Sequence, residues 1–154
     1  PHDPLVQQQF VAVHDAVRCC LTKKWVDDCF AAAGKSGAAM LACPVVATLK
    51  RVRGGEIVET VDRSGLYEAQ TPQVFEVSLL KKSREKATKI DTDKITDDSQ
   101  LVEALGHKVS IVETDSSNIK ITYPADAAIA EAILKTRPDP KKDGYIGPFY
   151  EAQW

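Results

Sequence analysis

The stretch "VAVHDAVRCC", residues 11–20, decides the fold class because it joins an apolar run to a polar cluster. A strand that is buried on both faces reads as an apolar run, and residues 10–13 fit that pattern. His14, Asp15 and Arg18 follow directly, at the carboxyl end of the predicted strand. Open α/β sheets place their ligands in the crevice beyond such strand ends. The stretch therefore predicts an α/β protein with a ligand site beside Asp15 and Arg18.

Strands and helices alternate along the rest of the chain. Apolar runs predict further strands at 37–45, 108–113 and 118–122. Helical composition and periodicity predict helices at 24–33, from about Val74 to 87, at 96–106 and at 125–135. Strands that alternate with helices imply a largely parallel α/β sheet.

The spacing of the apolar residues changes in "TLKRVRGGEIVETV", residues 48–61. Two β-rich runs, 48–52 and 57–61, flank Gly54-Gly55, which predicts a hairpin with a glycine turn. Its outward residues are largely charged. We therefore expect a β-hairpin arm, over about residues 45–69, that leaves the main sheet.

Composition excludes several classes of function. The chain has 154 residues, of which 44% are hydrophobic and 27% charged, as expected for one soluble globular domain. A net charge of -2 without a basic stripe argues against nucleic-acid binding, and no apolar stretch is long enough to span a membrane. The three histidines are scattered and the cysteines lack metal-ligand spacing, so we expect no metal site built by the chain. Reduced thiols in a reducing compartment are expected at Cys19, Cys20, Cys29 and Cys43.

Residues 136–154 form a segment rich in proline, glycine and lysine that ends in aromatic residues. The simpler interpretation is a tail whose aromatic side chains pack back on the body. A peptide that binds a partner is the alternative.

Four motifs occur in order: "VHDAVR", "ETVDRSGLYEAQTPQVF", "ITDDSQLVEALG" and "NIKITYPADAAIAEAIL". Together, from about Val11 to Leu134, they closely resemble the 2-C-methyl-D-erythritol 4-phosphate cytidylyltransferase family. The resemblance implies a Rossmann-like nucleotidyltransferase fold. It also implies transfer of a cytidylyl group from CTP to methylerythritol phosphate, with release of pyrophosphate, in non-mevalonate isoprenoid synthesis. Bacterial cytoplasm and plastid stroma are the compartments it implies.

Members of this family begin with a strand and a glycine-rich loop that holds the CTP triphosphate. This sequence has no equivalent, because the segment 34–37 lacks the preceding glycine of a phosphate-binding loop. We therefore expect residues 1–135 to correspond to the carboxyl-terminal half to two-thirds of a complete enzyme. A separate amino-terminal polypeptide is one partner that this interpretation leaves open.

The chemistry calls for cations, because the transition state at the α-phosphorus is highly anionic. By resemblance, Lys120 stabilises the α-phosphate, Asp15 binds the polyol of the substrate, and Arg18 positions a phosphate. Mg²⁺ is expected as cofactor, held mainly by the nucleotide phosphates. The alternatives are a solvated lysine and an Asp15–Arg18 ion pair that only fixes the loop. His14 is expected to be a packed, hydrogen-bonded residue.

The resemblance also implies a shared active site in a homodimer. In the family, the arm reaches a second subunit and delivers an arginine and a threonine, which correspond to Arg63 and Thr48 here. Further substrate or loop contacts are implied at Thr71, Thr96 and Thr122. Helix capping is the alternative for Thr71 and Thr96.

Two other functions remain open at this point. A ribitol 5-phosphate cytidylyltransferase would share "HDAVR", "QTPQ" and "NIKIT". A non-catalytic fragment that dimerises through the arm would explain the missing glycine-rich loop.

Overall fold

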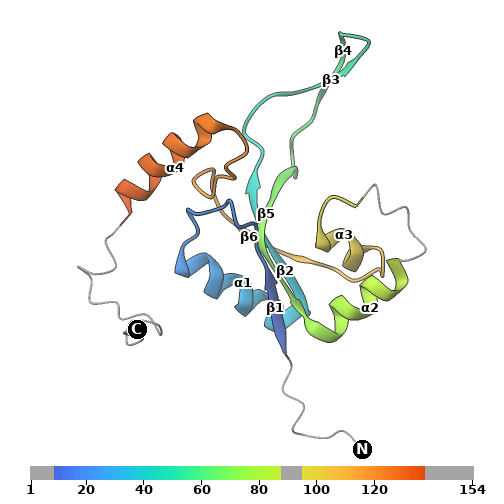
Figure 1. The fold of residues 1–154 in the computed structure, drawn as a ribbon. Coiled ribbons are helices and arrows are strands. Elements are labelled where there is room, and N and C mark those ends of the chain that lie inside the picture. Colours follow the sequence, from blue (N-terminus) through green and yellow to red (C-terminus); the bar gives the residue numbers. More distant parts are fainter. Residues whose placement is uncertain (1–8, 88–94, 138–154) are drawn as a thin grey trace, which may run out of the picture.

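The computed structural model describes residues 9–87 and 95–137, and its centre is a four-stranded mixed sheet (Figure 1). The strands lie in the order β1 (Phe10–Val13), β5 (Tyr67–Glu76), β2 (Ala38–Pro44) and β6 (Ser110–Glu113). The α/β class is confirmed. The expected mostly parallel pairing is wrong for these strands, because β5 pairs antiparallel with both β1 and β2, and only β2 and β6 pair in parallel.

Helices cover both faces of this sheet. Helix α1 (Lys23–Ser36) packs on one face, while α2 (Val77–Ala87) and α3 (Asp98–Glu103) lie on the other (Figure 1). Strand β2 is buried from Ala38 to Cys43, as its apolar run predicted. Alternate residues serve the two layers: Leu41 packs with α1, whereas Ala38 packs with Leu80 of α2 and Val102 of α3.

The helix expected from about Val74 begins later, at Val77. Residues 71–76 instead complete β5, whose residues Val74 and Phe75 are both fully buried in the layers on opposite faces of the sheet. Apolar residues that are buried on both faces give a continuous run rather than an alternation, so periodicity alone does not separate the end of this strand from the start of a helix.

Two other boundaries differ from the expectation. Residues 118–122 are not a strand. Side-chain hydrogen bonds hold this segment, together with backbone bonds from Asn118 N to the Asp115 carbonyl (3.4 Å) and from Ile121 N to the Val17 carbonyl (3.0 Å). Helix α1 continues through Gly34 to Ser36 and ends at Gly37, which has a φ of 81° and caps the helix. The last predicted helix is present as α4 (Pro124–Thr136).

The predicted hairpin is present as β3 (Leu49–Arg53) and β4 (Glu56–Val61), which pair only with each other in the described residues. Both glycines of its turn have positive φ, as a tight two-residue turn requires. The hairpin extends away from the central sheet (Figure 1), with Val52 and Ile57 more than half exposed. Its role as an arm toward a second subunit stays a prediction.

Two further sequence-based predictions concern the carboxyl-terminal tail and membrane-spanning helices. The tail predicted at 136–154 lies, beyond Arg137, outside the described residues. Among the helices that are described, none has the length and apolar character needed to cross a membrane.

Candidate active site

The polar cluster predicted beyond β1 is built by a turn. The backbone N–H of Arg18 donates to the carbonyl of Asp15 (3.0 Å), which folds the chain back after the strand ends. This turn lets the Arg18 Nε donate to Asp15 Oδ2 at 3.2 Å. The Arg18 side chain is only 11% exposed, whereas the Asp15 side chain is 31% exposed. Asp15 therefore presents charge to solvent while Arg18 supports it from inside.

Lys120 reaches the same carboxylate from a segment about a hundred residues further along the chain. Its Nζ lies 3.2 Å from Asp15 Oδ2, the oxygen that Arg18 also contacts. The Ile121–Val17 backbone bond brings this segment beside the 15–18 turn. At 48% exposure, the Lys120 side chain is open to a ligand. The structure thus gathers two cations on one carboxylate oxygen.

The charge state of Asp15 follows from these neighbours. Partial burial raises the pKa of the Asp15 carboxyl, but hydrogen bonds and charge attraction from Lys120 and Arg18 outweigh it, so the pKa lies below its ordinary value. The carboxylate is therefore ionised at neutral pH. An ionised carboxylate between two cations can accept hydrogen bonds from hydroxyls, and the cations can meet a phosphate.

Thr71 and His14 fix the backbone of the turn. Thr71 Oγ1 accepts from the Asp15 backbone N–H (3.0 Å) and lies 2.9 Å from His14 Nδ1. His14 Nε2 lies 3.2 Å from the carbonyl of Arg18, which can only accept. Nε2 can therefore donate to this carbonyl, and the Thr71 hydroxyl pairs with Nδ1. His14 is hydrogen-bonded, as expected, but it is exposed and not packed in the interior.

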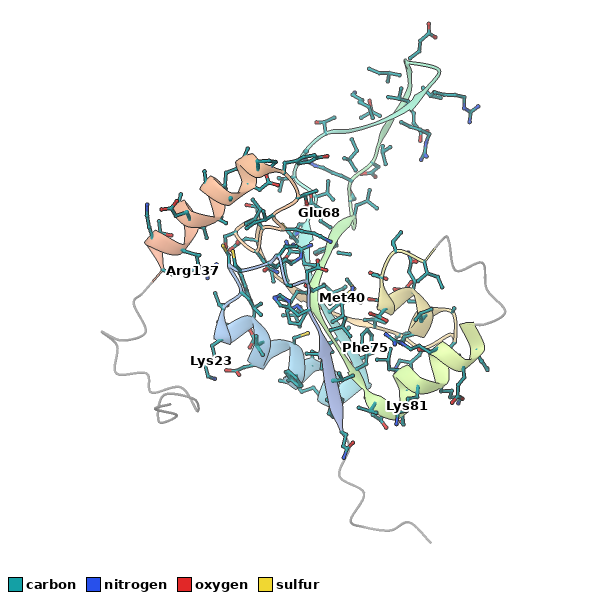
Figure 2. The ribbon with its side chains drawn as sticks, in the orientation of Figure 1. Lys23, Met40, Glu68, Phe75, Lys81 and Arg137 are labelled. Atoms are coloured by element: carbon teal, nitrogen blue, oxygen red, sulfur yellow. The ribbon has the colours of Figure 1, made fainter. Side chains whose placement is uncertain are left out.

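Arg137, which no sequence motif singled out, ties both halves of the cluster to α4. It lies at the end of this helix (Figure 2), and its Nη2 donates to the Cys20 carbonyl (2.9 Å) and to Ser117 Oγ (3.1 Å). Its guanidinium also lies 5.2 Å from the ring centre of Trp25. One arginine thus connects the loop after Arg18 with the loop before Lys120. The sequence signal was a lone basic residue after a helix, which is common and unspecific.

Of the remaining predicted site residues, Arg63, Thr48 and Thr96 have no contact with Asp15, Arg18 or Lys120 in the described residues, whereas Thr122 adjoins Lys120. Arg63 and Thr48 are exposed on the segments that flank the hairpin, and no contact in the described residues joins them to Asp15. Thr96 exchanges hydrogen bonds with Gln100, from Thr96 N to Gln100 Oε1 (2.9 Å) and from Gln100 Nε2 to Thr96 Oγ1 (3.0 Å). Thr122 lies two residues beyond Lys120, and its Oγ1 is 3.4 Å from the Lys120 carbonyl.

The donor set around Asp15 does not form a metal cage. Within residues 9–87 and 95–137, no group of three or more histidine, cysteine or carboxylate side chains could hold a metal ion. The neighbours of Asp15 Oδ2 are both cations. This set suits anions and hydroxyl groups better than a protein-held cation.

The family model described as IspD, 2-C-methyl-D-erythritol 4-phosphate cytidylyltransferase, matches residues 4–136. The chain is 46% identical over 130 residues to the enzyme of that name from Chromobacterium violaceum, which covers 83% of this chain and 56% of that protein. It is 45% identical over 130 residues to the one from Bacillus velezensis, with 84% and 56% covered. The chain therefore spans about half the length of these curated relatives.

Solved structures of enzymes with this name are also similar to the chain. The cytidylyltransferase from Thermus thermophilus superposes with a TM-score of 0.75 at 36% identity, covering 82% of this chain and 62% of that one. The one from Francisella tularensis gives 0.76 at 30% identity, covering 86% and 62%. With the cluster of Asp15, Arg18 and Lys120 inside the matched region, the chain belongs to the 2-C-methyl-D-erythritol 4-phosphate cytidylyltransferase family.

Proposed function

We propose that this chain forms the carboxyl-terminal part of a cytidylyltransferase that joins CTP to 2-C-methyl-D-erythritol 4-phosphate in isoprenoid synthesis. The observation that carries the proposal is the contact of Arg18 Nε and Lys120 Nζ with one oxygen of Asp15, each at 3.2 Å. The family match supports the substrates. The bacterial relatives favour the cytoplasm over a plastid stroma as the compartment.

The reaction needs little covalent help from the protein. A phosphate oxygen of the polyol substrate attacks the α-phosphorus of CTP, the bond to the β-phosphate breaks, and pyrophosphate leaves. Negative charge grows on the non-bridging oxygens as this happens. In our proposal the Lys120 ammonium meets that charge, Arg18 holds the carboxylate and the loop in place, and Asp15 accepts from the polyol hydroxyls. Thr71 keeps the Asp15 backbone in register.

Mg²⁺ belongs to the same proposal as a companion of the nucleotide. When bound, it would neutralise phosphate charge. Because the described residues offer no three-ligand cage, we assign its coordination mainly to the phosphates.

We further propose that the hairpin serves a second copy of the chain. A two-stranded hairpin is marginally stable in water unless it packs on something, and Val52, Ile57 and Val58 are exposed on this one. A symmetric dimer would cover these residues. Arg63 and Thr48 would then enter the partner's site, with Thr96 and Thr122 as further contacts near the substrate.

Mixed subunits test the shared site. Subunits with Arg63→Ala are combined with subunits that carry Lys120→Ala. The assay uses the form that converts CTP, either the chain alone or the chain with a separate amino-terminal polypeptide. Action across the interface predicts about half the wild-type rate per heterodimer, because one of two sites receives no mutation. Verified heterodimers without recovery, or a monomer by light scattering, would contradict the shared site.

The activity is tested by pyrophosphate release from CTP with methylerythritol phosphate and, in parallel, with ribitol 5-phosphate. We expect release with methylerythritol phosphate, and a fall of about a hundredfold in kcat for Lys120→Ala. Lys24→Ala is the matched control, since this lysine is exposed on α1 and pairs with Asp28. Faster turnover of ribitol 5-phosphate would assign the chain to that alternative. Absence of both turnover and binding would favour a non-catalytic fragment.

A further inference from the structure

Beneath the exposed cluster lies a buried side chain to which the sequence motifs gave no role. Asn118 is 0% exposed and precedes Lys120 by two residues. Its backbone carbonyl accepts from Arg18 Nη1 at 2.7 Å, the shortest of the Arg18 contacts. Its side-chain amide donates to Gln70 Oε1 (2.9 Å) and to the Thr71 carbonyl (3.1 Å). Asn118 thus touches strand β5, the Arg18 side chain and the Lys120 segment at once.

The orientation of this amide is fixed by its surroundings. Gln70 Nε2 faces the Asp115 carbonyl (3.3 Å), so Gln70 Oε1 must face Asn118 and the Thr114 hydroxyl (2.7 Å). A reversed Asn118 amide would place its oxygen against Gln70 Oε1 and the Thr71 carbonyl, two groups that only accept. The donors of Asn118 therefore point into β5, and this polar network is anchored in the sheet.

The amide oxygen of Asn118 is also buried, and no protein group in the described residues donates to it. The two amide donors therefore carry the side-chain anchoring of this residue.

We propose that Asn118 is a positioning residue that sets the spacing of Arg18 and Lys120 on Asp15. It fixes the Arg18 guanidinium through its backbone and the Lys120 segment through its side chain. Its meaning for catalysis rests on the proposed function, whereas its effect on the cluster does not. Removing the amide should let the 118–122 segment move away from β5 and separate Lys120 from Asp15.

The test reads the cluster directly by ¹³C NMR titration of the Asp15 carboxyl in the folded chain. The charged or titratable groups beside this carboxyl are Arg18, Lys120 and the nearby His14. Because the two cations hold the Asp15 pKa below its ordinary value of 3.8, Asn118→Ala should raise it toward or above that value. Lys120→Ala should do the same.

Two further variants make the result decisive. Ser36→Ala removes a partly buried hydroxyl from the end of α1 and should leave the Asp15 titration unchanged. Asn118→Ser keeps one donor and serves if Asn118→Ala does not fold. An unchanged Asp15 pKa in a folded Asn118 variant would overturn the proposal, whether or not the chain turns over CTP. A raised pKa with full kcat in an active assembly would overturn the catalytic role and leave the proposed function standing.

Discussion

Replacement of Arg18 by alanine should destabilise the chain far more than an average surface substitution. The Arg18 side chain is 11% exposed, and its guanidinium donates to Asp15 Oδ2 (3.2 Å), the Asn118 carbonyl (2.7 Å) and, more weakly, the Ala69 carbonyl (3.5 Å). Its loss leaves the Asn118 carbonyl without this donor in the interior. The turn after β1 and the Lys120 segment then lose a shared anchor.

The magnitude follows from these contacts. Breaking a buried ion pair costs about 3–5 kcal/mol, but Asp15 is partly exposed and keeps Lys120 as a partner. A net hydrogen bond to a charged group contributes about 1.5–3 kcal/mol. We therefore expect Arg18→Ala to lower the free energy of unfolding by about 2–3 kcal/mol. For a chain of this size that corresponds to a fall in Tm of roughly 6–10 °C.

Urea unfolding followed by circular dichroism at pH 7 measures this loss. Arg84→Ala is the matched control, because the Arg84–Asp98 pair (2.9 Å) has an arginine that is 61% exposed. Exposed pairs contribute less than about 1 kcal/mol. Equal losses for the two variants would refute the idea that Arg18 anchors the cluster from inside.

Three further outcomes follow from local features. Because the pKa of Asp15 is lowered in the folded chain, the stability that its carboxylate contributes is present above 3.8 and is lost as the pH falls through the folded-state pKa. The free energy of unfolding, measured with urea, should therefore fall less steeply between about pH 5 and pH 2 in Asp15→Asn than in the wild type. Gly37→Ala should cost more than about 1 kcal/mol in the same assay, because φ is 81° and a Cβ would lie 3.2 Å from a histidine nitrogen, whereas Gly34→Ala in open space should stabilise. Ellman's reagent at pH 8 should label exposed Cys19 at once and Cys29 only after unfolding, since burial raises the pKa of the Cys29 thiol to about 11; prompt labelling of Cys29 would contradict this.

Much of the fold could be predicted because local patterns carried it. The buried run of β2, the glycine turn of the hairpin and the proline at the start of α4 each specify one structure. Neither β5 itself nor its direction was predicted, because its pairing depends on distant residues: Val13 pairs with Gln73 and Ala38 pairs with Phe75. Propensity also made 118–122 a strand, where a buried amide anchors a loop instead.

The candidate site divides in the same way. Asp15 and Arg18 were visible as polar residues at a strand end, and Lys120 was assigned through the family resemblance. Their meeting on one oxygen is a tertiary fact. Asn118 was overlooked because a buried asparagine shows its role only through its partners. Arg137 lacked any motif for the same reason.

The most direct test of a substrate site at Asp15 is ¹H–¹⁵N NMR of the chain titrated with methylerythritol phosphate, first alone and then with CTP. We predict saturable shifts centred on the amides of residues 14–18 and 118–122, and weaker binding in Lys120→Ala. Lys24→Ala should bind as the wild type does. Shifts confined to α2 and α3, or none at millimolar ligand, would contradict a site built on Asp15, Arg18 and Lys120.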